Sequence, residues 1–313
     1  MKVLFLGTAE FACLSLEAIL TSRHKVAAVV TQPDRPKGRG RRLASSPVKF
    51  LAAKKNIPVF QPEKLRDPAA LEILRSFHPD LIVVVAYGQI LSSSVLSIPP
   101  RGCVNVHASL LPQYRGAAPI PWAILKGEQR TGVATMLMDS GLDTGPILLT
   151  EETPIAPEDT AGVLHDRLAI MGATLLLKTL DGLERETIAP RAQDHSRATY
   201  APKIAKEDGR IDWNMPAREL FNRLRAFDPW PGAFTRWGGR NLKIFRPCPV
   251  EETEEETRGK PGTVAQVSEK DLTIATARGC LRVREVQLEN RPRMGVAEFL
   301  RGYPLKVGEL LGG

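Results

Sequence analysis

Residues 103–116 read CVNVHASLLPQYRG and open with a short apolar run that ends in polar side chains. The run alternates with a period of two, so Asn105 and His107 point to the same side of one predicted strand. The Pro, Tyr, Arg and Gly within residues 109–116 cannot continue that strand. We therefore expect an amide and an imidazole side by side where a strand ends, which is where open α/β sheets place ligands.

Residues 133–145 read VATMLMDSGLDTG. They follow a predicted helix that has Pro119 near its first turn and Gly127 just past its end. They predict a strand over 133–138 and then a loop that carries Asp139 and Asp143. A carboxylate of this loop is therefore expected to meet the amide and the imidazole.

The chain begins with a strand over 2–7, a helix over 10–21 and a strand over 26–31, and a continuous apolar strand follows over 80–86. This order predicts a Rossmann-like, mostly parallel sheet in an α/β domain. A dinucleotide site would need G-x-G-x-x-G after the first strand. Only Gly7 stands there, so we expect no nicotinamide cofactor.

The C-terminal third has a different pattern. Short alternating runs separated by turn residues lie between 233 and 288 and predict a small β-barrel. A polar stretch with two prolines, 190–206, precedes them. We interpret the chain as a catalytic domain over 1–189, a linker over 190–206 and a barrel domain over 207–313.

The composition is that of an ordinary globular protein, because 43% of the 313 residues are hydrophobic and 25% are charged. Four scattered cysteines without a CxxC pair predict neither a zinc site nor a disulfide framework, and we expect no metal. The net charge of +8 permits binding to a polyanion. His24, His78 and His195 lack polar company and are interpreted as structural. His165 lies within a predicted helix and is interpreted as a structural or surface histidine.

Residues 31–49, TQPDRPKGRGRRLASSPVK, are strongly basic with Asp34 as the single acid. Their prolines and glycines are expected to exclude regular structure. A loop rich in Arg and Gly beyond a strand end can fold against phosphates. The predicted RNA contacts are Arg35, Lys37, Arg39, Arg41 and Arg42.

The run Asn105-x-His107-x-Ser109-Leu110-Leu111-Pro112, with Arg115-Gly116 and Asp139-x-Gly141-Leu142-Asp143-Thr144-Gly145, resembles the signature of formyltetrahydrofolate-dependent formyltransferases. The resemblance extends over nearly the whole chain.

This resemblance implies 10-formyltetrahydrofolate as the formyl donor and methionyl initiator tRNA as the acceptor, in preparation for translation initiation. It implies that the barrel is an OB-like module that binds tRNA and that the basic loop meets the acceptor end. It also implies a folate pocket lined by Ala86, Tyr87, Gly88, Ser109, Leu110, Leu111, Pro112 and Asp139.

Formyl transfer needs donors for the oxygen that becomes negative when an amine attacks the formyl carbon. Asn105 and His107 are the predicted donors, and Asp143 is the predicted base for the amine proton. A Ser–His hydrolase built on Ser109 is not favoured, because residues two apart beyond a strand end rarely align and no G-x-S-x-G elbow exists.

Two alternatives stay open at this point. The same chemistry could serve a small amine, either glycinamide ribonucleotide or an amino sugar nucleotide, but a small acceptor needs neither the basic loop nor the barrel. A non-catalytic RNA-binding protein would leave Asn105, His107 and Asp143 unexplained. We expect a monomer. No import leader is seen, so we expect the bacterial cytosol, and an organelle protein whose leader has been removed is the alternative.

Overall fold

The computed structural model describes residues 1–37, 42–248 and 259–312. The chain divides into two compact units, and each is described by itself. The first comprises Met1–Pro119, Thr131–Thr153 and His165–Ala201; the second comprises Ile120–Arg130, Pro154–Leu164 and Pro202–Gly313. No helix in the described ranges has the length and apolar character needed to cross a membrane.

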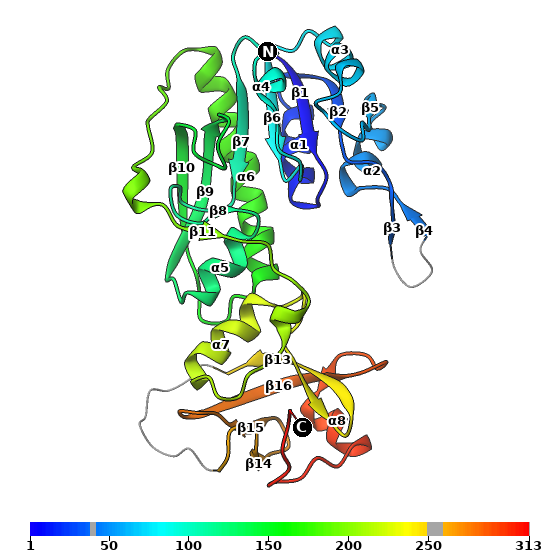
Figure 1. Cartoon of the computed structure of the whole chain (residues 1–313), viewed down its shortest axis with the longest axis vertical. Coiled ribbons are helices and arrows are strands. Elements are labelled where there is room, and N and C mark those ends of the chain that lie inside the picture. The colour runs from blue at the N-terminus through cyan, green and yellow to red at the C-terminus, as the bar shows by residue number, and fades with distance from the viewer. Residues whose placement is uncertain (38–41, 249–258, 313) are drawn as a thin grey trace. The chain divides into compact units, whose positions relative to one another are not determined.

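The first unit is built on a seven-stranded sheet with the order β10-β9-β7-β6-β1-β2-β5 (Figure 1). The five strands from β7 to β5 are parallel, and β9 runs antiparallel to β7. The strands are β1 (Lys2–Gly7), β2 (Lys25–Val30), β5 (Val59–Phe60), β6 (Leu81–Val85), β7 (Cys103–His107), β9 (Arg130–Leu137) and β10 (Ile147–Pro154).

Helices cover both faces of this sheet, because the central strands are apolar on both sides. One core cluster joins Leu4 and Ile82 of the sheet to Leu74 and Val95 of the helices on that face. On the other face, Gly172 packs against Val106 of β7. The helices of this unit are α1 (Phe11–Leu20), α2 (Pro47–Lys54), α3 (Pro68–Ser76), α4 (Ser93–Leu96) and most of α6 (Ala161–Glu184), whereas α5 (Pro119–Leu125) falls almost wholly in the second unit.

The basic stretch forms a small hairpin, so the expectation that it has no regular structure was wrong. Strands β3 (Arg35–Lys37) and β4 (Arg42–Ala44) pair antiparallel and project from the sheet domain (Figure 1). Pro36 is tolerated because a two-stranded ribbon consists of edge strands only. Residues 38–41 lie outside the described ranges.

The second unit is built on an antiparallel sheet with the path β12-β13-β16-β15-β14, and β17 pairs with β16. Apolar side chains of this sheet pack with α7 and α8 into a separate core. The elements are α7 (Ala217–Ala226), β12 (Phe234–Trp237), β13 (Arg240–Pro247), β14 (Val264–Val267), β15 (Leu272–Ala275), β16 (Cys280–Leu288), β17 (Met294–Gly295) and α8 (Val296–Gly302).

The predicted fold class is confirmed. The N-terminal sheet is mixed and dominated by parallel pairs, and the C-terminal sheet is a curled antiparallel half-barrel. Short two-residue strands β8 (Arg115–Gly116) and β11 (Tyr200–Ala201) also pair with each other, which joins the polar stretch after α6 to the loop after β7.

Candidate active site

The candidate site lies where three parallel strands end together. Gly7 of β1 pairs with Val85 of β6, and Val84 pairs with Asn105 of β7. This register places the carboxyl ends of the three strands at one edge of the sheet, where open α/β sheets bind ligands. His107 is the last residue of β7 and therefore lies at this edge.

The structure brings the three predicted catalytic side chains together. Nδ2 of Asn105 lies 3.5 Å from Oδ1 of Asp143, and Nδ1 of His107 lies 3.7 Å from Oδ2 of Asp143. The His107 side chain is 7% exposed and the Asp143 side chain 13%. Charges in such a poorly hydrated place interact more strongly than they would on the surface.

Asp143 reaches this place through a loop that folds back. Because β9 is antiparallel to β7, its end residue Leu137 pairs with Val104 at the start of β7. The loop must therefore return along β7, and Asp143 takes a positive φ of 52° within it. The backbone N–H of Gly116 donates to Oδ2 of Asp143 at 2.8 Å and holds the carboxylate in place.

The contacts of His107 define its tautomer. Nε2 lies 2.9 Å from the carbonyl oxygen of Tyr114. A carbonyl only accepts hydrogen bonds, so Nε2 carries the proton. Nδ1 is then the ring atom that faces Asp143, and it donates an N–H only when the imidazole is protonated. The predicted donor role of His107 therefore requires its imidazolium form.

Two of the predicted folate residues have side chains engaged within the protein. Oγ of the buried Ser109 donates to the carbonyl of Gln113 at 2.6 Å. Leu111 packs against Ala134 and Met136. These contacts shape the loop that follows β7. A folate contact by Ser109, Leu110, Leu111 or Pro112 stays a prediction.

The segment after β6 presents its backbone at the same edge. Ala86 has a φ of 44° and Gly88 a φ of 83°, and both residues are exposed. The side chain of Tyr87 turns into the core instead, where burial raises the pKa of its phenol to about 12. An exposed backbone of this kind lets a ligand approach closely.

Asp139 organises the loop that carries Asp143. Its Oδ1 accepts hydrogen bonds from the Gly141 amide at 3.0 Å and from the Thr144 hydroxyl at 2.6 Å. The predicted contact of Asp139 with folate stays untested beside this clear structural role.

The base of the basic hairpin is anchored through Asp34. Its carboxylate accepts from Nζ of Lys49 at 2.7 Å and from Nε2 of Gln61 at 2.9 Å. The hydrogen bond from Lys49, followed by that from Gln61, lowers the pKa of Asp34. Asp34, the single acid of the stretch, therefore binds Lys49 and Gln61 at the base of the hairpin.

Among the predicted RNA contacts, Arg35 is exposed. Arg39 and Arg41 lie outside the described residues, and only the backbone is described for Lys37 and Arg42. The structure therefore leaves this group of contacts as a prediction.

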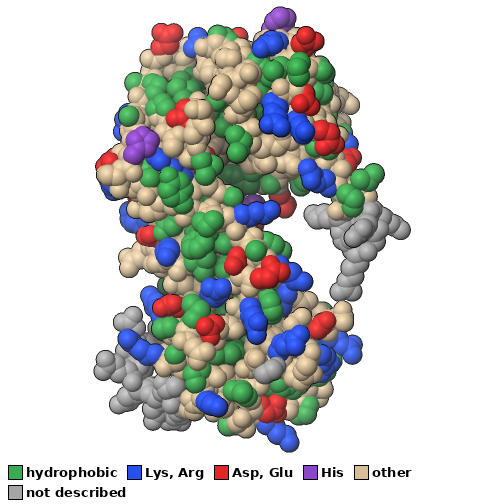
Figure 2. Space-filling view, in the orientation of Figure 1, with side chains coloured by type: hydrophobic (Ala, Val, Ile, Leu, Met, Phe, Trp, Pro, Cys, Tyr) green, Lys and Arg blue, Asp and Glu red, His purple; other side chains and the backbone are tan. Residues whose placement is uncertain are grey.

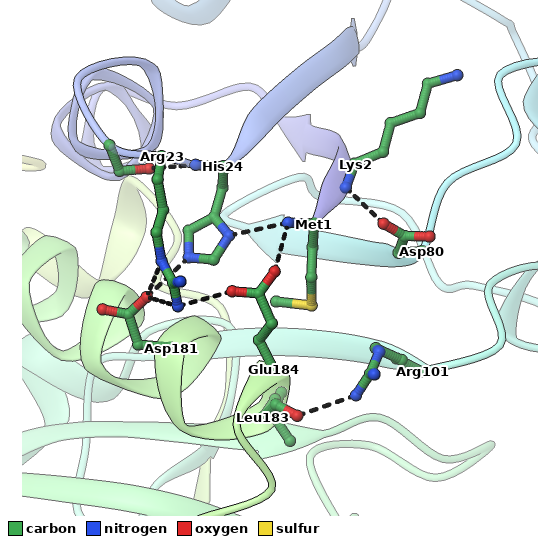
Figure 3. Close-up of polar contacts among 10 residues, drawn as sticks. Met1, Lys2, Arg23, His24, Asp80, Arg101, Asp181, Leu183 and Glu184 are labelled. Carbon is green, nitrogen blue, oxygen red and sulfur yellow. Dashed lines mark hydrogen bonds and ion pairs between the residues drawn. The ribbon is translucent and has the colours of Figure 1, made fainter.

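A second polar cluster surrounds His24 (Figure 3). Its imidazole contacts the amine of Met1 at 3.3 Å and Oδ1 of Asp181 at 3.2 Å, and Glu184 accepts from the same amine at 2.9 Å. The interpretation of His24 as a residue without polar company was wrong, because its partners come from distant positions. The same applies to His195, whose Nδ1 lies 3.3 Å from a terminal nitrogen of Arg115.

Two residues that were not singled out in the sequence contact the loops of the candidate site: Gln193 and Thr199. Both lie in the stretch interpreted as a linker. Gln193 is buried and donates to the carbonyl of Asp143 at 2.9 Å. Thr199 accepts from the Tyr114 amide at 2.8 Å. These two polar residues lie between prolines, and no local sequence pattern indicates that they contact distant loops.

Comparison with known families gives the class of protein to which this fold and candidate site belong. The model of the formyl transferase domain matches residues 1–180, and the model of the formyl transferase C-terminal domain matches residues 203–304. The chain belongs to the formyl transferase family and is an enzyme of that family.

Several relatives match this chain over nearly its whole length. A protein of Trichlorobacter lovleyi named methionyl-tRNA formyltransferase is 50% identical over 99% of this chain and 96% of its own length. One of the same name from Syntrophus aciditrophicus is 50% identical over 100% of this chain and 99% of its own.

Solved structures share the fold at low identity. The sugar 3N-formyl transferase WlaRD has a TM-score of 0.67 at 21% identity, over 93% of this chain and 99% of its own. HypX from Aquifex aeolicus in complex with tetrahydrofolic acid has a TM-score of 0.63 at 20% identity, over 99% of this chain and 50% of its own.

Proposed function

We propose that this enzyme transfers the formyl group of 10-formyltetrahydrofolate to the amino group of methionyl initiator tRNA and so makes N-formylmethionyl-tRNA for translation initiation. The observation that carries the proposal is the meeting of Asn105, His107 and Asp143 at the carboxyl edge of the sheet. The acceptor is suggested by relatives of the same length that are named methionyl-tRNA formyltransferase.

The folate is a substrate in this reaction. The acceptor amine attacks the formyl carbon, a new C–N bond forms, and the carbonyl oxygen becomes negative. An N–H of Asn105 stabilises that oxygen, and protonated His107 can add the N–H of Nδ1. Removing one such donor typically costs about 3 kcal/mol of barrier. The bond from carbon to the folate nitrogen then breaks.

Asp143 is suited to carry the proton. Oδ2 accepts the Gly116 amide at 2.8 Å, whereas Oδ1 contacts Asn105 only at 3.5 Å. Oδ1 is therefore the oxygen with capacity to take a proton from the amine, directly or through water. The proton ends on the departing folate nitrogen, which balances the reaction without a metal or a nucleophilic side chain.

Two regions are proposed to bind the tRNA: the basic hairpin and the barrel. Not every basic residue of the barrel is free for this task. Nζ of Lys243 donates to the carbonyl of Pro231, and Arg246 and Arg293 pair with Glu285. Lys and Arg side chains are interleaved with acidic ones on the face shown in Figure 2. The hairpin is therefore the better candidate for phosphate contacts.

One assay tests the proposal against the small-acceptor alternative. The enzyme is mixed with 10-formyltetrahydrofolate and, in parallel, with methionyl initiator tRNA, glycinamide ribonucleotide or an amino sugar nucleotide. Formylated methionine should appear only in the first reaction, and tRNA with an acetylated methionine should give none. Turnover with a small amine and not with the tRNA would overturn the proposed acceptor.

The cellular setting and the oligomeric state are part of the same proposal. We place the enzyme in the bacterial cytosol, in keeping with its bacterial relatives. We propose that it acts as a monomer, which light scattering at the assay concentration would test: a mass near 34.4 kDa is expected.

A further inference from the structure

The segment after α6 returns to the candidate site and is tied to it at both ends. Ile147 and Arg191 exchange backbone hydrogen bonds of 2.8 Å at one end. At the other end, β11 pairs with β8, and the amide of Ala117 donates to the carbonyl of Ala201 at 2.9 Å. We call residues 191–201 the strap.

Gln193 is the strap residue that holds the loop carrying Asp143. Its Nε2 donates to the carbonyl of Asp143 at 2.9 Å and to the carbonyl of Gly145 at 2.7 Å. One side-chain amide therefore uses both of its N–H groups on one short loop. The backbone on either side of Asp143 is fixed by this pair of bonds.

Arg115 fixes the orientation of Gln193. The guanidinium is buried and donates to Oε1 of Gln193 from Nε at 3.2 Å and from a terminal nitrogen at 2.7 Å. A bond from a charged donor is stronger than a neutral one, particularly away from water. The amide therefore has its oxygen toward Arg115 and both hydrogens toward the loop.

Arg115 also precedes Gly116, whose amide holds the carboxylate of Asp143. The contacts thus form a closed ring. Gln193 holds the backbone of Asp143, Arg115 holds Gln193, and the next residue holds the side chain of Asp143.

Thr199 makes the corresponding link to His107. Its Oγ1 accepts from the Tyr114 amide at 2.8 Å, and its carbonyl accepts from the Arg115 amide at 2.9 Å. Tyr114 has a φ of 56°, which a non-glycine residue adopts only when its surroundings hold it. The carbonyl of this residue accepts the Nε2 proton of His107.

We propose that Gln193 and Thr199 are positioning residues for the formyl transfer: Gln193 acts through Asp143, and Thr199 acts through Tyr114 on the tautomer of His107. This inference rests on the proposed function for its kinetic effect. Its geometric content, the placing of one carboxylate and one imidazole proton, can be measured without any turnover.

The first experiment replaces Gln193 by Ala in the full chain. The Gly116 amide proton, followed by NMR, should move toward the position it has in Asp143→Ala, because the carboxylate leaves its hydrogen bond. The value of kcat should fall by about 10- to 100-fold while KM for the tRNA stays unchanged, since misplacing a catalytic group affects the chemical step.

Ser196→Ala is the matched control. Ser196 is an exposed strap residue whose hydrogen bonds go to Asp194. The Gly116 resonance and the kcat of this variant should equal those of the unmodified enzyme. An unmoved Gly116 amide in a folded Gln193→Ala variant, or an equal loss in Ser196→Ala, would overturn the role of Gln193.

The second experiment keeps the inference testable if Gln193→Ala does not fold. Thr199 is exposed, so Thr199→Val removes the oxygen that accepts the hydrogen bond of the Tyr114 amide without leaving a cavity in the core. The nitrogen shifts of His107 should show one tautomer, with the proton on Nε2, in the unmodified enzyme and in Thr199→Ser. In Thr199→Val they should show a mixture, with a loss of kcat that the serine variant restores.

A pure Nε2–H tautomer in Thr199→Val would overturn the role of Thr199. These outcomes are distinct from failure of the proposed function. If the unmodified enzyme does not formylate methionyl-tRNA, the function is wrong, while the NMR signatures still decide whether the strap positions Asp143 and His107.

Discussion

The backbone amide of Gly116 donates a hydrogen bond of 2.8 Å to Oδ2 of Asp143, and this contact joins the two loops that build the site. Gly116 belongs to the loop after β7, and Asp143 belongs to the loop after β9. The bond leaves Oδ1 as the oxygen nearest Asn105. Under the proposed function, this bond therefore decides which oxygen of the carboxylate faces the reacting atoms.

Replacing Asn105, His107 or Asp143 by Ala should lower the single-turnover rate of formylation by about 10²-fold or more in each case, because each removes a donor or the base from the transition state. Binding of the tRNA, measured by filter retention, should stay near normal. Nearly unchanged turnover in any two of the three variants would defeat the assignment.

Gly116→Ala should damage both stability and activity. An added Cβ would lie 2.8 Å from the carbonyl oxygen of Ala201, and the φ of 114° is unfavourable for any side chain. Strain of this kind costs about 1–3 kcal/mol. Urea unfolding should show a loss of this size, together with a reduced kcat. Gly295→Ala is the matched control, since nothing lies within 4 Å of its added Cβ.

Neutralising Arg39, Arg41 and Arg42 together should weaken tRNA binding and flatten its dependence on salt. Each arginine that binds a phosphate should contribute about 1 to the slope of log K against log salt, and its removal should reduce the slope by that amount. Arg246→Ala is the control for removing a positive charge outside the hairpin. Arg246 is paired with Glu285 at 3.0 Å, so its loss should leave the salt dependence unchanged. An unchanged slope in the triple variant would exclude phosphate contacts by the hairpin.

Acid should destabilise the first unit in two stages. Burial lowers the pKa of His24, so the folded state favours the neutral ring. Stability is then lost as pH falls below the unfolded value of about 6.5. The bond from Arg23 lowers the pKa of Asp181, and the bond from the Met1 amine lowers that of Glu184. Their contribution is lost below pH about 4.

Urea unfolding of His24→Asn between pH 7 and pH 5 tests the first stage. The variant should lose less stability over this range than the unmodified enzyme, because it lacks the group that takes up a proton on unfolding. His78→Asn is the matched control, as His78 is exposed. Equal pH slopes for all three proteins would show that His24 does not contribute.

Much of the fold could be predicted because the spacing of apolar residues along the chain indicates strands and helices locally. The expected strand over 80–86 corresponds to β6, and the helix expected over 10–21 corresponds to α1. The pairing of β3 with β4 was not predicted, because Pro and Gly argue against strands in general and not against a short ribbon of two edge strands.

The sequence by itself determined that Asn105 and His107 share a face, since alternation along one strand requires only covalent geometry. It also indicated a mostly parallel N-terminal sheet and an antiparallel C-terminal one, as observed. Only the tertiary structure decided which residues hold Asp143 and His107. The bond from Gln193 to Asp143 spans 50 residues and that from Tyr114 to Thr199 spans 85. Contacts at such separations follow from how loops return to the sheet, and no local period encodes that path.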